Sequence, residues 1–487
     1  MSEFSEHLEK CMINSGMTEN QLAKISGFNR SYIALMKNGQ RVSPDTKKMV
    51  KLFEALNLSP YEYDELWRKY IRARLGDDIY ERNMAVLDFI ESFGNISNIS
   101  MESSFDFKIS DVKTVENRID VEYLMKAIME RECEKKDGYI HAIMQADSVV
   151  FINSLHSIYK KNKNLPIEHI VCLENSGILE NEKNQLYNIQ LLKKLIPIAI
   201  LSNSNSYQIY YYYDRVSSHL NMSSIMPYLI ITSSCVLCIS ASVDRCIMLT
   251  EKEMHTLYEN IFRDQKRKCR SLLRKIEGGV DMVEYYNSLS GKEETVYSIA
   301  QQPCIGVLRL EHLVKKYFHH DNEKVIFLLE KFLRKNQEVR ENSDVKNISY
   351  CTKSGLRRLA LEGVVDELPR EMYRDLEVRD RIFVLKMLQS MIQKKKYELY
   401  LLDEQEINFP KELYVNVYGF TDASFMYISD KEKARFVLNE GSLTKILYDF
   451  LVELCKTPPV SSKEAAEAFL TELIWELENN VKDNVTK

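Results

Sequence analysis

Residues 18–39, with the sequence TENQLAKISGFNRSYIALMKNG, constrain the fold of this chain more than any other stretch. Thr18 and Gln21 have the spacing of a capping box, in which two side chains satisfy free backbone N–H groups at the start of a helix. The apolar side of that helix is supplied by Leu22, Ala23 and Ile25. Gly27 follows at once, and glycine is favoured where a helix ends because it tolerates the left-handed conformation. The pattern predicts a short helix followed by a tight turn.

A second short helix is predicted after the turn. Asn29 is a favourable N-cap, because its side-chain oxygen can accept a hydrogen bond from an N–H of the first turn. Ile33 and Met36 are three residues apart, so they share one face of the helix and point inward. Asn38 and Gly39 supply turn chemistry at its end. The segment therefore predicts two short helices joined by a tight turn.

This segment resembles the helix-turn-helix DNA-binding domain of the phage repressor/Cro (XRE-like) family. The resemblance continues beyond the motif through Arg41, Pro44, Met49, Leu52, Phe53 and Leu56. The usual end of the domain appears as LNLSPYEYDELW, so the resemblance covers residues 3–67, a minor part of the chain. Other small helical bundles also carry a capping box and a glycine stop. The agreement of capping, turn and core positions favours the repressor-like domain.

The resemblance implies that the second helix of the motif lies in the major groove of double-stranded DNA and contacts bases with its N-terminal part. The residues at these positions are Asn29, Arg30, Ser31, Tyr32 and Leu35. Arg30 can pair bidentately with guanine, and Leu35 can touch a thymine methyl group. Asn29 or Ser31 can bond a base edge or a phosphate.

A second set of residues is expected at the DNA backbone. The set comprises Gln21, Lys37, Asn38 and Arg41. Gln21 stands near the start of the first helix of the motif, where the family often makes a backbone contact. The other three lie at or after the end of the second helix, where the chain approaches the other strand. Glu19 would repel a phosphate, so Gln21 and backbone N–H groups are the better candidates at the first helix.

The distribution of charge supports this interpretation. Between residues 21 and 51 the chain has seven basic residues against Asp45 alone, a net charge of +6, whereas the whole chain carries −5. Positive charge concentrated on one small module of an acidic protein is what attraction to phosphates requires. The alternative of an ordinary solvated face stays open for Lys47, Lys48 and Lys51.

Length and composition constrain the remainder of the chain. At 487 residues it is long enough for about two to four domains, and its 45% hydrophobic and 28% charged residues are typical of a soluble globular protein. The N-terminus is charged and no signal peptide is expected. The longest apolar run, residues 226–248, is interrupted by Asp244 and Arg245 and is not expected to span a membrane. Ten scattered cysteines suit a reducing compartment, so a cytoplasmic location is predicted.

The predicted division into domains has four parts. These are a helix-turn-helix domain at 1–70, a helical connector and linker at 71–111, and two halves of a sensor and dimerisation region at 112–277 and 278–487. Residues 61–93 predict two helices or one bent helix, interrupted at Gly76. This connector is expected either to form a dimer seam or to pack on its own domain. Residues 94–111 are rich in serine and asparagine and are expected to be the linker.

The fold class predicted is multidomain: an all-α helix-turn-helix head followed by a large α/β (or α+β) region with a mixed sheet. In its first half, helices are expected at 115–135, 149–161, 183–195 and 251–276, and strands at 139–145, 167–175, 196–201, 207–214, 228–242 and 246–250. In its second half, helices are expected at 310–317, 323–341, 355–361, 380–395, 442–455 and 462–478, and strands at 397–402, 412–420 and 424–430.

An internal duplication is an open alternative for this region. The segment CIMLTEKEMHTLYENIF in the first half and FMYISDKEKARFVLNEG in the second both place an apolar strand before a short charged turn. Chance similarity between two strand–turn–helix units is the other explanation.

No catalytic, cofactor-binding or metal-binding motif is found in the large region. It has no GxGxxG after a strand, no GxxxxGK[ST], no HExxH, no H-x-K and no GxSxG. Cys235 and Cys238 form a CxxC, but on one strand their odd spacing would direct them to opposite faces. The run of four tyrosines at 210–213 is expected to alternate between the two faces of a strand, either in sheet packing or as the wall of a ligand pocket. No catalytic residue, cofactor or metal is predicted.

These features predict a sequence-specific DNA-binding transcription regulator, such as a repressor, that is not an enzyme. Its large region is expected to supply a homodimer interface and to sense an unknown small-molecule or peptide effector. One alternative is an enzyme or defence effector whose head autoregulates its operon. Another is a peptide-pheromone-responsive regulator, although the strand-rich residues 207–250 argue against a purely helical repeat.

Overall fold

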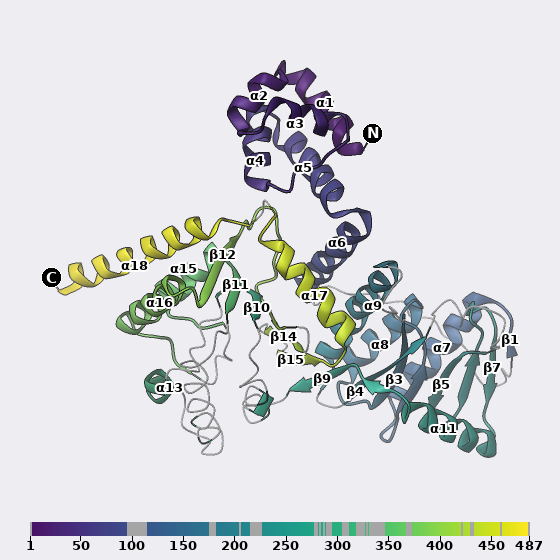
Figure 1. Ribbon diagram of the computed structural model, residues 1–487. Coiled ribbons are helices and arrows are strands. Elements are labelled where there is room, and N and C mark those ends of the chain that lie inside the picture. The colour runs from purple at the N-terminus through teal and green to yellow at the C-terminus, as the bar shows by residue number, and fades with distance from the viewer. Residues whose placement is uncertain are drawn as a thin grey trace.

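The computed structural model describes residues 2–94, 114–174, 182–203, 206–214, 226–276, 295–303, 311–317, 346–366, 373–419, 422–428, 433–457 and 460–485, with scattered residues between 281 and 330. A small helical head, residues 3–75, is joined through helix α6 to a larger α/β body, residues 114–485 (Figure 1). The predicted combination of a helix-turn-helix head and a mixed α/β region is confirmed.

The head consists of five helices whose ends follow the predicted capping pattern. They are α1 (Glu3–Ser15), α2 (Glu19–Ser26), α3 (Arg30–Lys37), α4 (Thr46–Ala55) and α5 (Pro60–Leu75). Thr18 and Gln21 form the expected capping box, Gly27 closes α2 in the left-handed conformation, and Asn29 caps α3. The helices enclose one core whose largest side chains are Phe4, Phe53, Trp67 and Tyr70.

The prediction for Ile25 is wrong. Its side chain is 52% exposed, whereas Leu22 and Ser26 are buried. At 3.6 residues per turn, Leu22, Ala23 and Ser26 lie on one side of α2 and Ile25 lies beyond the edge of that side. Ser26 can be buried because its hydroxyl donates to the Leu22 carbonyl oxygen at 2.6 Å.

The connector consists of two helices separated by Gly76, one of the two predicted forms. Gly76 has φ 87° and ψ 155°, a conformation open almost only to glycine, and α6 (Asp77–Ser92) begins directly after it. Helix α6 buries Val86, Phe89 and Ile90 in the core of the body. It therefore packs on the body of its own chain. Of the predicted linker, residues 95–111 lie outside the described residues.

Two ion pairs also connect this region to the body. Arg74, near the end of α5, lies 3.3 Å from Glu453, and Arg82 on α6 lies 3.8 Å from Asp449. Both carboxylates belong to helix α17 (Gly441–Leu454), which packs beside α6 and α9 (Glu182–Leu201) (Figure 1). The arginine side chains are only 13% and 9% exposed, so these contacts are largely shielded from water.

The first half of the body contains one eight-stranded mixed sheet. Its strands are β1 (Thr114–Val115), β2 (Ile140–Ile143), β3 (Ile167–Glu174), β4 (Tyr207–Asp214), β5 (Tyr228–Thr232), β6 (Val236–Ile239), β7 (Cys246–Leu249) and β8 (Arg270–Ser271). Their order in the sheet is β1-β7-β6-β5-β2-β3-β4-β8. Strands β2, β3 and β4 are parallel, and the remaining pairs are antiparallel.

The second half contains a seven-stranded sheet. Its strands are β9 (Leu273–Ile276), β10 (Val296–Ala300), β11 (Asn347–Thr352), β12 (Tyr397–Leu402), β13 (Leu413–Tyr418), β14 (Asp422–Ile428) and β15 (Lys433–Leu438). Their order is β12-β11-β10-β13-β14-β15-β9, with β10, β11 and β12 parallel and the others antiparallel. Strands β10, β11 and β15 were not predicted, and β9 lies within residues that were predicted to be helical.

The two halves repeat one plan of six strands. Taken in chain order, β2 to β7 and β10 to β15 have the same neighbours and the same parallel and antiparallel pairings. The counterpart of β7 is β15, so the predicted alignment of CIMLT with FMYIS was displaced by one strand, onto β14. Between the halves, β8 and β9 are separated only by Leu272. Its N–H donates to Ile209 of β4, and its carbonyl oxygen accepts from Asn439 after β15.

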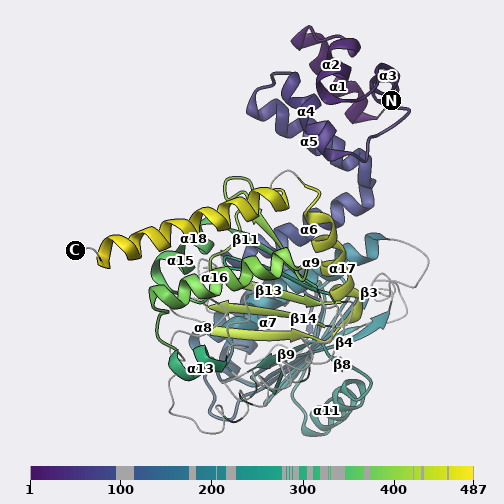
Figure 2. The ribbon, with the colours of Figure 1, turned by 60° about the vertical axis from the view of Figure 1, so that its left-hand side comes forward.

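Helices cover both faces of the sheets. Helices α7 (Arg118–Cys133), α8 (Val149–Lys161) and α9 share the largest core with α6, α17 and strands of both halves. Helix α11 (Lys252–Lys266) covers the other face of the first sheet. The other face of the second sheet is covered by α13 (Glu311–Tyr317), α15 (Lys353–Glu362), α16 (Val378–Gln393) and α18 (Lys463–Val485). The views in Figures 1 and 2 place α11 at the end of the body that is remote from the head.

Three predicted elements of the body are wrong in type or extent. The expected strand IPIAIL is the last part of α9, because a short apolar run that is buried all round does not distinguish a strand from a helix. The helix expected at 251–276 ends at Lys266, and residues 270–276 are extended along the sheet edges. The strand expected at 228–242 is two strands, β5 and β6. The helix expected at 323–341 lies almost entirely outside the described residues.

The four consecutive tyrosines alternate as expected. Tyr211 packs into the main core, whereas Tyr210 and Tyr212 face α11. Tyr213 is 42% exposed and its hydroxyl donates to Glu440. These contacts correspond to sheet packing. Among the described helices, none combines the length and the apolar character needed to cross a membrane.

Candidate nucleic-acid interface

Helix α3 presents a polar face to solvent and an apolar face to the head. Ile33 and Met36 are fully buried against the other helices. Arg30 and Ser31, in its first turn, are exposed, and Leu35 is half-buried one turn after Ser31. Because the buried face is held by the core of the head, the exposed side chains project from a fixed backbone. A helix presented in this way matches the dimensions of a DNA major groove.

Asn29 caps α3 with one half of its side chain and leaves the other half without this role. Its Oδ1 accepts a hydrogen bond of 2.7 Å from the N–H of Tyr32, which caps the helix. The carbonyl half of this carboxamide is therefore engaged, and its amide NH₂ is the half available to a ligand. Gln21 is similar, because its Oε1 accepts from the N–H and the hydroxyl of Thr18 at 2.9 and 2.7 Å.

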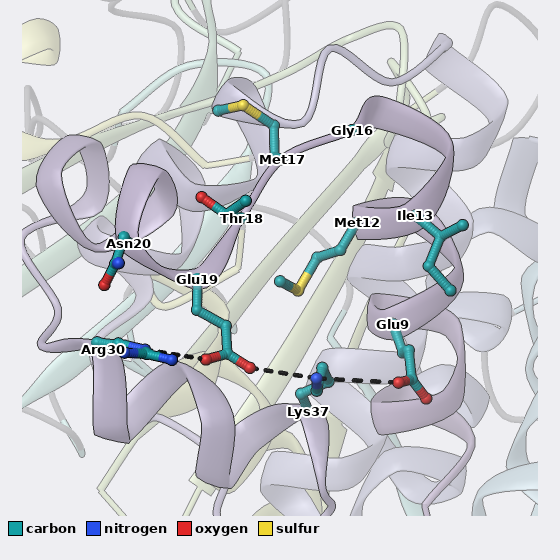
Figure 3. Close-up of a pocket in the computed structure, with 10 residues that line it drawn as sticks. All are labelled: Glu9, Met12, Ile13, Gly16, Met17, Thr18, Glu19, Asn20, Arg30 and Lys37. Atoms are coloured by element: carbon teal, nitrogen blue, oxygen red, sulfur yellow. Dashed lines mark hydrogen bonds and ion pairs between the residues drawn. The ribbon is translucent and has the colours of Figure 1, made fainter.

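A carboxylate of α2 binds two of the predicted DNA-contacting side chains. Glu19 lies 3.3 Å from Arg30 Nε and 3.1 Å from Lys37 Nζ, which is also 3.9 Å from Glu9 (Figure 3). The hydrogen bond from Lys37, followed by that from Arg30, holds the pKa of the Glu19 carboxyl below its usual range. Glu19 is thus ionised at neutral pH and shares its charge between the two cations. Arg30 contacts Glu19 through Nε, and its side chain is 67% exposed, so its two terminal nitrogens are accessible to a ligand.

These four residues border a hollow between α1 and the motif. The hollow has a volume of about 560 Å³, and its other lining residues are Met12, Ile13, Gly16, Met17, Thr18 and Asn20. Its lining combines apolar side chains of α1 with the charged groups of α2 and α3 (Figure 3). The hollow therefore borders α3 at both Arg30 and Lys37, beside the surface where DNA is expected.

The opposite flank of α3 is aromatic. The rings of Phe28 and Tyr32 stack with centroids 5.3 Å apart and planes within 3° of parallel. The guanidinium of Arg41 lies 5.9 Å from the Tyr32 centroid, and Lys48 Nζ lies 5.5 Å from the Phe28 centroid. Tyr32 is consequently held against the head and is less free than Arg30 to enter a groove. The stack places the cations Arg41 and Lys48 beside one edge of α3.

The predicted residues thus fall into three groups along α3. Arg30 and Lys37 lie on the flank facing Glu19, Ser31 and Leu35 lie between the flanks, and Tyr32 lies with Arg41 on the aromatic flank. Gln21 stands on α2 and Asn38 at the exposed end of α3.

Sequence reasoning missed three contributors to this surface. Glu9 comes from α1, outside the motif, and no local pattern marks it. Phe28 lies within the turn of the motif. An aromatic residue next to the exposed start of a helix could have been predicted to contribute to the surface. Lys48 was counted among the basic residues of the module, with a solvated position left open, and its place over Phe28 depends on how α4 packs.

Among the described residues, no group of three or more His, Cys, Asp or Glu side chains could hold a metal ion. Cys235 packs into the main core, whereas Cys238 packs on the α11 side of the sheet. The prediction that the two point to opposite faces is confirmed, although Cys235 precedes β6 and is not part of a strand. Burial raises the pKa of both thiols, which disfavours the thiolate that a metal would need.

Comparison with known proteins identifies the head. Residues 8–63 match the helix-turn-helix family model. No curated protein sequence matches the chain. Among solved structures, phosphatidylserine synthase of Haemophilus influenzae Rd KW20 is similar to 79% of this chain over 96% of its own, at 8% sequence identity and a TM-score of 0.23. The helix-turn-helix match supports a DNA-binding regulator, and residues 8–63 form a helix-turn-helix domain of the XRE type.

Proposed function

We propose that this protein is a sequence-specific DNA-binding transcription regulator that inserts α3 into the major groove of an operator. The observation that carries the proposal is the construction of α3: two fully buried side chains fix it to the head, while its first turn is polar and exposed. The surrounding module has a net charge of +6 within an acidic chain, which favours approach to phosphates.

Within this proposal, Arg30 is the principal base-contacting residue. Its Nη1 and Nη2 atoms are presented outward and match the O6 and N7 acceptors of guanine. Ser31 and Leu35 contact neighbouring base edges, with Asn29 contributing its amide group, and Tyr32 is limited to the edge of the contact. Phosphates are bound by four residues: Gln21, Lys37, Asn38 and Arg41.

The body is proposed to set the position of the head. One module of this size reads a short half-site, so specific binding is expected to require two copies and thus a homodimer. Helix α6 is buried in the body, and Arg74 and Arg82 pair with carboxylates of α17. A small-molecule or peptide effector that displaces α17 would therefore move the head, and would change which half-site spacing fits.

The base-contacting role of Arg30 is tested by substitution. Selection of bound sequences from a random duplex pool with the full-length protein would define the operator. Arg30→Ala should then lose discrimination at one base pair by about 1–3 kcal/mol while other positions keep theirs. Arg68→Ala, at an exposed arginine on α5, is the matched control and should keep all discrimination.

Two results would contradict the proposal. An equal loss of affinity on every sequence for Arg30→Ala would show that Arg30 binds only backbone. Sedimentation of the full-length protein on its operator tests the dimer, and a complex containing one copy at micromolar protein would exclude it.

A further inference from the structure

A second concentration of positive charge lies in the body, at the end of α11. Residues 263–275, RDQKRKCRSLLRK, contain seven basic residues and one aspartate, a net charge of +6. This equals the net charge of residues 21–51 in less than half the length. Since the whole chain carries −5, the remainder of the protein is strongly acidic.

Two of the seven basic side chains are only partly exposed and bind groups of the body. Lys266 pairs with Glu168 and lies 4.7 Å from the ring centroid of Tyr210. Lys275 donates to the backbone carbonyl oxygens of Ala199 and Ser202. The other five are exposed and form what we call the basic patch: Arg263, Arg267, Lys268, Arg270 and Arg274.

The charge of the basic patch is only slightly compensated. Asp264 pairs with Arg267 at 3.0 Å, but both side chains are more than 60% exposed, so the pair is readily exchanged for another anion. Arg263 contacts the neutral Asn260, and Arg274 lies 5.9 Å from the ring centroid of Tyr285, so neither contact cancels the charge. Arg270 bonds the hydroxyl of Tyr211, and the Lys268 side chain has no hydrogen bond or ion pair to any described residue. The patch thus presents a surplus of cations to solvent.

The geometry of the patch suits an extended anion. Arg263 and Arg267 share one face of the last turns of α11, and Arg270 and Arg274 lie on the extended segment that follows. Arg270 pairs in register with Tyr211, whose side chain enters the main core, so the cations wrap around the edge of the first sheet. With a rise of about 1.5 Å per helical and 3.3 Å per extended residue, the chain that carries the patch is roughly 25 Å long along its path. This length fits several successive phosphates of a nucleic-acid backbone.

A membrane surface fits the same region less well. Leu257 and Ile261 on α11 are 50% and 39% exposed, but the outward face that they share also carries the carboxylates Glu253 and Asp264. Carboxylates at those positions would be repelled by an anionic bilayer. Arginine also predominates in the patch, four to one over lysine, and its fork-shaped guanidinium suits phosphate oxygens.

The patch and α3 are far apart. The head and α11 lie at opposite ends of the molecule in both Figure 1 and Figure 2. A short duplex held by α3 would not reach the patch without strong bending.

We propose that the basic patch is a second nucleic-acid contact surface, which binds the phosphates of duplex DNA independently of sequence. One chain would then hold two DNA segments, one at α3 and one at the patch. The two-segment arrangement rests on the proposed function of the head, whereas the affinity of the patch itself does not.

The test uses the full-length protein and two labelled duplexes. The first duplex carries the selected operator and is immobilised, and capture of a second duplex of unrelated sequence is then measured at several salt concentrations. The patch variant is Arg267→Gln, Lys268→Gln, Arg270→Gln. We expect it to capture the second duplex at least about tenfold less well, with a salt slope smaller by about 2.7, while retaining the operator.

A matched control removes the same charge elsewhere. Lys394→Gln, Lys395→Gln, Lys396→Gln changes three consecutive exposed lysines after α16 and should capture the second duplex as the unaltered protein does. An equal loss in this control would overturn the proposal, because net charge alone would explain it. So would failure of the unaltered protein to capture a second duplex, or capture of phosphatidylserine vesicles in preference to DNA.

A head variant separates this proposal from the proposed function. Arg30→Ala with Lys37→Ala should lose the operator but still bind the unrelated duplex through the patch. If no operator is ever selected but the patch variant still lowers binding to DNA, the function of the head fails and the patch stands.

Discussion

Glu19 offers the sharpest test of how the head is tuned for DNA. Its carboxylate lies 3.3 Å from Arg30 and 3.1 Å from Lys37, so it competes with DNA for the positive charge of both side chains. Glu19→Gln keeps the shape of the side chain and removes its charge. The substitution should therefore strengthen DNA binding, the opposite of what is usual for a residue in an interface.

The size of the effect follows from the exposure of the two pairs. Ion pairs near the surface contribute about 0.2–1 kcal/mol. In the pair with Lys37 the two side chains are 27% and 21% exposed, so its contribution is near the upper end of that range. In the pair with Arg30 the arginine side chain is 67% exposed, so its contribution is near the lower end. Their sum of about 1 kcal/mol corresponds to a roughly fivefold gain in affinity. Removing one negative charge next to the phosphates should also steepen the salt slope by about 0.9.

The assay is a fluorescence titration of a labelled duplex with the full-length protein at several salt concentrations. Glu54→Gln is the matched control, because it removes the same charge from an exposed position on α4 that lies close to Tyr63 and away from α3. It should change the affinity little. Weaker binding by Glu19→Gln, or an unchanged salt slope, would refute the competition model. A selective loss at guanine would instead show that Glu19 positions Arg30.

Two further predictions concern stability. Burial, followed by repulsion from Lys160, lowers the pKa of His156 from 6.5 to about 4 in the folded protein. Between these two pH values the unfolded state binds more protons than the folded state. The free energy of unfolding therefore falls as the pH drops from 6.5 to about 4. Between pH 7 and pH 4, His156→Phe should lose about 3 kcal/mol less of its free energy of unfolding than the unaltered protein, as measured by urea unfolding. An identical loss in both proteins would show that His156 does not titrate as described. Gly76→Ala should destabilise the junction between head and body by about 1–3 kcal/mol in thermal unfolding, because a Cβ there meets no neighbour and only the backbone at φ 87° is strained. An unchanged melting temperature would mean that the two helices adjust without strain.

The head could be predicted closely because its signals are local. The capping box at Thr18, the glycine stop at Gly27 and the N-cap at Asn29 each act within a few residues, and all three are present. The exposure of Ile25 was missed because it depends on how α2 is rotated about its axis against the core, and a small rotation is enough to change it. The ion pairs of Glu19 depend on how α1, α2 and α3 pack together, which spacing along the chain does not specify.

The body was predicted less well for two physical reasons. A short apolar run such as IPIAIL satisfies the pattern of a buried strand and of a buried helix alike, and its place under the sheets decides between them. Strands β10 and β11 pair in parallel across a long segment of chain, and such pairing leaves no local turn signal. The sequence shows the basic residues after Arg263, but a helix was expected there. The extended path of β8 and β9 shows how these side chains are arranged around the edge of the sheet.

The repetition of one strand order in the same sense along both sheets has a consequence for assembly. Two repeats joined head to tail leave one free sheet edge at each end of the molecule. If the free edge of one molecule could pair with the opposite edge of the next, the molecules would form a fibre that has no natural end. Here part of each outer edge is already paired within the chain. The short strand β1 occupies the edge beside β7, and at the other end Val460 pairs with Leu402 while the Ser461 N–H donates to Leu401. These pairings disfavour fibre growth through the sheets, and we expect any closed dimer to form through helical surfaces.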